Sequence, residues 1–186
     1  MGEMSFTSRN RMVFPDTVRQ DMTMPFGQMT IAFNGSEGWR KGPPGLEKIP
    51  ADQLRRTLAH LKNVNLLFRP PDDPKSVQWL AAEAVENRSC DVIEVRLPDS
   101  EPARLYVDRA TGDVLKRAYR VENSSGGLAG VEEFFSDYRD VSGLRLSFKV
   151  RELRDGKFAR ESVTSNMKLN TGLKTGDLLQ DLRSAR

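Results

Sequence analysis

Apolar and polar residues alternate at period two through much of this chain, and this pattern restricts its fold more than any other feature. In LRLSFKV (144–150) the apolar residues share one face of an extended chain, and the basic residues and serine share the other. TVRQDMTM (17–24) and GQMTIAF (27–33) repeat the pattern, which is typical of strands with one buried face. We therefore predict a mainly β (α+β) fold, a curved antiparallel half-barrel meander of about nine to eleven strands, because a sheet of that length has to curl or close.

One segment departs from this pattern and has the spacing of a helix. In PADQLRRTLAHLKNVNLLF, Leu54, Leu58 and Leu61 recur on one helical face, and Pro50 lies where the first turn tolerates proline. We predict one clear helix over about residues 51–67 that covers the concave face of the half-barrel.

Other segments bear on where the strands lie and where the domain ends. The alanines of SVQWLAAEAV (76–85) favour helix, but the following ENRSC resembles a hairpin turn leading into a strand, so we predict a strand. The prolines of KGPPG (41–45) are expected to end the first group of strands, because proline cannot donate to a ladder. The alternation slips between Val150 and Leu153, which indicates a bulge or a strand that leaves the core. We treat residues 1–186 as a single domain with a loosely attached tail at 171–186.

The residue inventory argues against several classes of function. The net charge of +3 arises from 29 basic and 26 acidic residues of mixed order, without the clustered basic face that nucleic-acid binding needs. No run of about 18 apolar residues occurs, so we predict no transmembrane segment. With one cysteine, Cys90, the chain can form neither an internal disulfide nor a cysteine zinc site. We expect no cofactor and no nucleic-acid partner.

We predict no catalytic residues and no metal ligands. A nucleophile needs a histidine beside it, yet His60 lies mid-helix among leucines, and Cys90 is interpreted as a small buried hydrophobe. Paired-carboxylate chemistry needs two acids that face one cleft. The candidate acids are instead interpreted as charged positions on the solvent face of a strand: Glu132, Glu133, Asp137 and Asp140. A hydrolase built on the last two is the least favoured alternative.

Methionines concentrate at the start of the chain. Six of the seven lie within the first 30 residues, and four of these are at or near expected inward-facing strand positions: Met12, Met22, Met24 and Met29. Methionine fills irregular gaps in cores and also adapts to varied apolar ligands. The sequence therefore leaves two interpretations open, ordinary core filling and an N-terminal sheet that lines an adaptable apolar cavity.

The order of motifs resembles the lipoprotein-sorting superfamily, the periplasmic carriers of the LolA and LppX type. FPDTVRQDMTMPFGQMTIAFNGSEGW is similar to a strand pair and turn of that family, and ENRSCDVIEVRLPDSEPARLYVDRATGDVLKRAYR to its hairpin, turn and returning strand. FFSDYRDVSGLRLSFKVRELRDGK resembles its most characteristic signature, and the match spans about residues 13–170. The chain departs from the pattern at Ser142, where aspartate is usual, and at Ser147, where proline is usual. The family's N-terminal helix and first strand are not recognised.

The resemblance implies a half-barrel whose concave apolar face holds a lipid or a lipoprotein acyl chain. It also implies a periplasmic or otherwise extracytoplasmic protein. The abrupt start in a predicted strand favours a fragment lacking its N-terminal targeting segment over a cytosolic protein. Related domains occur as C-terminal modules of pitrilysin-type zinc peptidases, although this chain has no HxxEH motif. The residues expected to line the ligand-binding face are Met22, Met24, Met29, Ile31, Phe33, Leu105, Val107, Leu146 and Phe148.

Two functions from different classes follow from these observations. The first is a non-enzymatic extracytoplasmic module that binds an apolar ligand, lipid or acyl chain. The second is a structural or docking domain appended to a larger peptidase, with a cavity filled by its own side chains.

Overall fold

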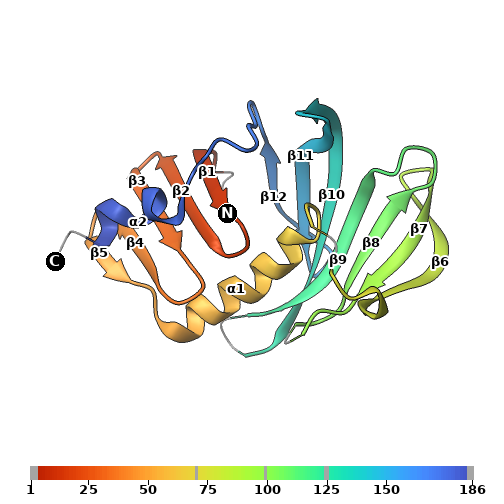
Figure 1. The fold of residues 1–186 in the computed structure, drawn as a ribbon, viewed down its shortest axis with the longest axis horizontal. Coiled ribbons are helices and arrows are strands. Elements are labelled where there is room, and N and C mark those ends of the chain that lie inside the picture. The colour runs from red at the N-terminus through yellow and green to blue at the C-terminus, as the bar shows by residue number, and fades with distance from the viewer. Residues whose placement is uncertain (1–3, 70, 99, 124–125, 184–186) are drawn as a thin grey trace. The chain divides into compact units, whose positions relative to one another are not determined.

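The computed structural model describes residues 4–69, 71–98, 100–123 and 126–183. Twelve strands, two α-helices and one short 3₁₀ helix occur in this part of the chain (Figure 1). In chain order they are β1 (Thr7–Val13), β2 (Thr17–Met24), β3 (Gly27–Phe33), β4 (Gly38–Gly42), β5 (Gly45–Lys48), α1 (Ala51–Asn65), η1 (Pro74–Ser76), β6 (Val77–Val85), β7 (Arg88–Val95), β8 (Ala103–Asp108), β9 (Val114–Glu122), β10 (Leu128–Val141), β11 (Leu144–Arg154), β12 (Lys157–Val163) and α2 (Thr175–Arg183).

The predicted mainly β class and antiparallel meander order are confirmed. The strands nevertheless form two sheets, one in the order β1-β2-β3-β4-β5 and one in the order β12-β11-β10-β9-β8-β7-β6. The chain divides into two compact units, Met1–Leu61 with Asn170–Arg186, and Lys62–Leu169. The single domain expected for the chain stays a prediction, and each unit is described by itself below.

The expectation that KGPPG ends the first group of strands is wrong. Pro43 and Pro44 form the turn between β4 and β5, whose ends pair as Gly42 with Gly45. Proline is compatible with this position because a turn residue does not have to donate to the ladder. The segment at 76–85 is a strand, as predicted, with a register shift between Trp79 and Ala81.

The predicted helix is confirmed and ends slightly earlier than expected. It runs over Ala51–Asn65, and turns follow it in which the Phe68 amide donates to the Asn65 carbonyl at 2.9 Å. Among the described residues, no helix is long and apolar enough to cross a membrane.

In the first unit, α2 covers one face of the five-stranded sheet (Figure 1). Three fully buried leucines of α2 pack against Ala32 and Trp39: Leu178, Leu179 and Leu182. Arg19 of β2 adds a polar contact, because its Nη2 donates to an Asp181 carboxylate oxygen at 3.1 Å. The described part of the tail is therefore packed in a core, which differs from the loose attachment we expected.

In the second unit, both faces of the seven-stranded sheet carry apolar clusters. On one face, Leu66 packs with Val95, Ala103, Tyr119 and Val131. We call this side the Leu66 face. The cluster on the opposite face contains Val85, Cys90, Val92, Tyr106 and Leu115. Because both faces carry buried apolar residues, face assignments here follow from register rather than from exposure.

The segment FFSDYRDVSGLRLSFKV forms the hairpin between β10 and β11. Val141 pairs with Leu144, and the turn residues Ser142 and Gly143 have φ angles of 53° and 85°. Positive φ suits the glycine, which has no Cβ to clash with the following carbonyl. The predicted slip after Val150 is also present, as a register shift between β11 and β12 at Glu152 and Leu153.

Asp137 lies within β10 but has a φ of 54°, in the left-handed region. Its carboxylate accepts from Arg139 Nε at 3.0 Å on the exposed side. We expect Asp137→Gly to change the unfolding free energy little and Asp137→Val to lower it by about 1–2 kcal/mol, because a β-branched residue is strained at this φ. Asp140→Val, at an exposed position of β10 with ordinary backbone, is the matched control and should stay within about 0.5 kcal/mol. Urea denaturation tests this, and equal losses in the two valine variants would contradict it.

Candidate functional site

The nine residues predicted to line an apolar face divide between the two units. The first unit holds Met22, Met24, Met29, Ile31 and Phe33, all on β2 and β3. The second unit holds Leu105 and Val107 on β8, and Leu146 and Phe148 on β11. The two groups are therefore described as two separate surfaces.

In the first unit, the five predicted residues share one face of the sheet. Met22 pairs with Met29, and Phe33 pairs with Val18, so their side chains lie on the same side of β2 and β3. This methionine face (Met22, Met24, Met29, Ile31 and Phe33) is opposite the face that α2 covers. Met22 and Phe33 are each 6% exposed, and the other three are half-buried. The prediction that these five side chains lie on one face is thus correct. That this face binds a ligand stays a prediction.

The start of α1 packs on part of the methionine face. Gly38 of β4 lies beside Phe33, and a Cβ added there would be 3.1 Å from Ile49 Cδ1 and 3.4 Å from Leu54 Cδ1. A side chain at this glycine would therefore press on the helix, and the small residue permits the close contact.

A hollow of about 320 Å³ lies over the β1, β2 and β3 strands of the first unit. Met22 and Met29 belong to its lining. The other lining residues are polar or charged: Arg9, Asp21, Thr23, Gln28 and Thr30. This composition is unlike the apolar cavity expected from the sequence.

In the second unit, the four predicted residues all lie on the Leu66 face. Leu105 pairs with Ile93 in β7, two positions before Val95 of the Leu66 cluster. Leu146 and Phe148 lie on the same side of β11 as Val150, which pairs with Phe135 of β10. Phe135 in turn lies on the same side of β10 as Val131 of the Leu66 cluster. Leu105 and Val107 are half-buried, whereas Leu146 and Phe148 are buried. The predicted residues are therefore brought to one side of one sheet.

A row of charged residues crosses the same face, and sequence reasoning did not assign it to the site. Cross-strand pairing places Arg117 beside Glu133, Glu133 beside Glu152, and Glu152 beside Arg160. Glu133 had been interpreted as a solvent-face position, and this is wrong because the residue is buried. The sequence did contain a sign of this burial. Arg117, Glu133 and Glu152 each lie on the side of their strand that carries the apolar residues of the Leu66 face.

Arg117 and Glu133 form a buried ion pair. Arg117 Nε donates to Glu133 Oε2 at 2.8 Å, and the two side chains are 2% and 5% exposed. Arg117 Nη1 donates to the carbonyl oxygen of Asn63 in the last turn of α1. The cation therefore satisfies both a buried carboxylate and a helix C-terminal carbonyl, where a positive charge is favourable.

Glu152 is held by two arginines. Its carboxylate accepts from Arg154 Nε at 2.7 Å and from Arg160 Nε at 2.6 Å. Burial raises the pKa of Glu152, but hydrogen bonds and charges from the two arginines outweigh this, so its pKa lies below the usual value. Burial is also the main cause that raises the pKa of Tyr119, and the Glu133 charge adds to it. With its pKa lowered, Glu152 is ionised, and its carboxylate binds Arg154 and Arg160 within the protein.

The other candidate groups for chemistry are engaged in structural roles. Arg139 donates to both carboxylate oxygens of Asp137, and this hydrogen bonding is the main cause that lowers the Asp137 pKa. Cys90 is fully buried, and burial raises the pKa of its thiol. Within the described ranges, no group of three or more histidine, cysteine, aspartate or glutamate residues could hold a metal ion.

The chain shares its fold with proteins of known structure. The sequence matches no protein-family model, and no curated protein matches it. A domain from Vibrio parahaemolyticus, described as an outer membrane lipoprotein-sorting protein domain, aligns over 96% of this chain and 82% of its own, with a TM-score of 0.57 and 15% identity. A DUF1329 family protein from Desulfovibrio piger aligns over 93% of this chain and 80% of its own, with a TM-score of 0.54 and 15% identity. At this identity the similarity establishes the fold, so the fold implied by the resemblance is confirmed. Neither similarity bears on the predicted peptidase.

Proposed function

We propose that this chain is a non-enzymatic extracytoplasmic module that holds an apolar ligand, a lipid or a lipoprotein acyl chain against the Leu66 face. One observation carries the proposal. Leu105 and Val107 lie on β8, and Leu146 and Phe148 lie on β11. Register places all four on one face of the sheet, and the chain shares its fold with a lipoprotein-sorting domain.

The chemistry of the face suits a chain of methylene groups. Leu105 and Val107 are half-buried, so part of their apolar surface is still accessible. Val77 and Trp79 continue the same face onto the outermost strand, β6, where Trp79 is 58% exposed. Covering such surface contributes about 25 cal/mol per Å² of apolar area removed from water. Leu146 and Phe148 are already buried, so a ligand that contacts them has to displace the groups that cover them.

The methionine face supports the same class of ligand in the first unit. Its three methionines have flexible, polarizable side chains that adapt to apolar surfaces of varied shape. We include this face in the proposal as a second apolar surface. The proposed location is periplasmic or otherwise extracytoplasmic, and the fold similarity to a lipoprotein-sorting domain supports it.

The alternative is a structural or docking domain appended to a larger peptidase, with no ligand of its own. The observation in its favour is the buried Arg117–Glu133 pair, which fills the middle of the Leu66 face with the protein's own side chains. The two functions differ in one measurable property, namely saturable uptake of an apolar probe.

The test is fluorescence titration of the delipidated protein with a dansyl-labelled fatty acid. We expect saturable binding, and we expect Leu105→Gln to weaken it about tenfold, because a polar amide facing an acyl chain costs about 1–3 kcal/mol. Leu128→Gln is the matched control, since Leu128 is exposed and its register places it on the opposite face. Thermal denaturation verifies that both variants are folded. Absence of saturable uptake, or equal weakening in both variants, would contradict ligand binding on the Leu66 face.

A further inference from the structure

We infer that the β11–β12 end of the Leu66 face binds an anionic head group, so that the preferred ligand is an amphiphile with a phosphate or carboxylate group. The inference rests on the proposed function for the apolar part of the ligand. Its separate structural basis is that Glu152 accepts hydrogen bonds from the Nε atoms of both Arg154 and Arg160.

The two guanidinium groups are held by their inner nitrogens. Glu152, only 1% exposed, accepts one hydrogen bond from the Nε of each arginine, at 2.7 Å and 2.6 Å. The Arg154 and Arg160 side chains are nevertheless 58% and 54% exposed. Across the described residues, the terminal nitrogens of these two side chains donate no hydrogen bond. Four donor-bearing nitrogens therefore remain for an external acceptor.

The backbone positions the second arginine. Glu152 pairs with Arg160, whereas Leu153 pairs with Phe158, so β12 contains an extra residue, Ala159, at the bulge. Without this bulge, Ala159 would lie opposite Glu152 and Arg160 would point to the other face. A bulge that re-aims a side chain in this way is often found beside a functional site.

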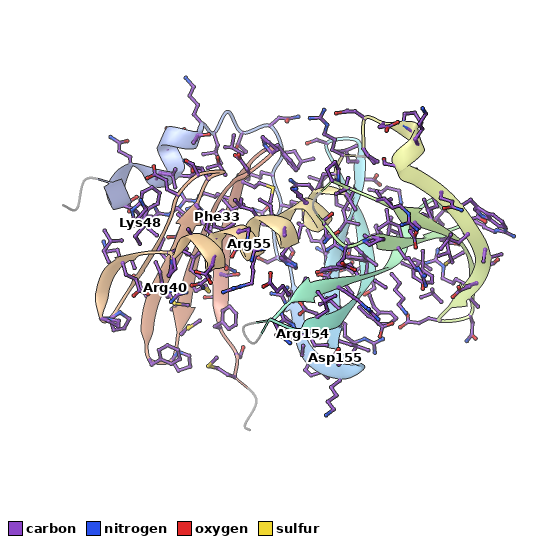
Figure 2. The ribbon with its side chains drawn as sticks, turned by 90° about the horizontal axis from the view of Figure 1, so that it is seen from below. Phe33, Arg40, Lys48, Arg55, Arg154 and Asp155 are labelled. Atoms are coloured by element: carbon purple, nitrogen blue, oxygen red, sulfur yellow. The ribbon has the colours of Figure 1, made fainter. Side chains whose placement is uncertain are left out.

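The local charge favours an anion. Arg154 and Arg160 outnumber Glu152, which leaves one net positive charge, and Lys157 pairs directly with Arg154. The nearby carboxylate of Asp155 accepts from the Gly130 amide at 2.8 Å, at the turn that joins β11 to β12 (Figure 2). Glu133, on the neighbouring strand, is already neutralised by Arg117. Planar guanidinium groups bind carboxylate and phosphate through paired hydrogen bonds.

The apolar surface begins directly beside these arginines. From Glu152, alternate residues of β11 on the same face are Val150, Phe148 and Leu146. Six residues of extended chain span about 20 Å, so a ligand with its anionic group at the arginines can extend its chain along β11 once it displaces the groups that cover Phe148 and Leu146. The proposed function alone requires only the apolar chain, and the arginines add selection for its head group.

The test is isothermal titration of the whole chain with dodecyl phosphate, dodecyl maltoside and inorganic phosphate. Arg154→Gln/Arg160→Gln removes the anion site. Arg154→Lys/Arg160→Lys keeps both charges beside Glu152 but lacks the planar donors, so it serves if the glutamine variant does not fold. Arg96→Gln/Arg104→Gln is the matched control, because these arginines flank another buried glutamate, Glu94, on the opposite face.

We expect dodecyl phosphate to bind the wild type at least about tenfold more tightly than dodecyl maltoside, and to lose that advantage in both 154/160 variants but not in the control. Inorganic phosphate that binds alone and is lost in the same variants, without any binding of dodecyl maltoside, would support the anion site and overturn the acyl-chain face. Equal binding of both detergents by all variants would overturn the anion site and leave the proposed function standing. Absence of all binding would overturn both.

Discussion

Replacing Arg117 with methionine is expected to lower the free energy of unfolding by about 3–5 kcal/mol, because it leaves the Glu133 carboxylate buried without a partner. Arg117 and Glu133 are 2% and 5% exposed, so water cannot replace the lost hydrogen bonds. The Asn63 carbonyl at the end of α1 loses its donor in the same variant. Urea denaturation followed by far-UV circular dichroism measures the loss.

Two further variants separate this explanation from loss of packing. Arg117→Met/Glu133→Leu removes both charges, and we expect it to recover most of the stability, since replacing a whole buried ion pair by apolar residues is often neutral. Arg104→Met is the matched control, because Arg104 is half-exposed and its partner Glu94 keeps Arg96. It should cost no more than about 1 kcal/mol. A double variant as unstable as Arg117→Met would contradict the buried-charge explanation.

The second large effect is expected at Leu179 of α2. This side chain is fully buried between α2 and the five-stranded sheet. Leu179→Ala should therefore lower the unfolding free energy of the first unit by about 2–5 kcal/mol, through lost apolar contact and the cavity that remains. Leu173→Ala, at an exposed position shortly before the helix, should change it by no more than about 0.5 kcal/mol.

The fluorescence of Trp39 can report on this unit specifically. The chain has two tryptophans, and Trp39 belongs to the same cluster as Leu179, whereas Trp79 lies in the second unit. In a Trp79→Phe background, urea denaturation then follows the first unit alone. A Leu179→Ala variant as stable as Leu173→Ala would indicate that α2 is loosely attached, as we expected from the sequence.

Helix α2 was missed because its local signal is weak. It has nine residues, and an isolated helix of that length is only marginally stable in water. The positions of Leu178, Leu179 and Leu182 suit one helical face, but the helix forms because Ala32 and Trp39 cover that face. β5 was missed for a different reason, since Pro43 and Pro44 were taken to end the sheet and instead form a turn.

Local sequence patterns also missed part of the candidate site on the Leu66 face. Alternation along β8 and β11 correctly grouped Leu105 with Val107 and Leu146 with Phe148. The same rule would have placed Glu133 inward, but charged residues are seldom buried without a partner, so it was assigned to solvent. Its partner Arg117 lies 16 residues earlier in the chain. No local pattern connects the two.

The sequence by itself determined which residues become strands, because alternation at period two depends only on neighbours along one chain segment. It also determined which side chains of each strand lie together, including Leu146, Phe148 and Val150. Only the tertiary structure decided that Glu133 meets Arg117, that Glu152 meets Arg160, and that α2 buries its leucines on a sheet. The physical reason is strand register. The pairing between strands, together with the one extra residue at the β12 bulge, determines which charged side chains face one another.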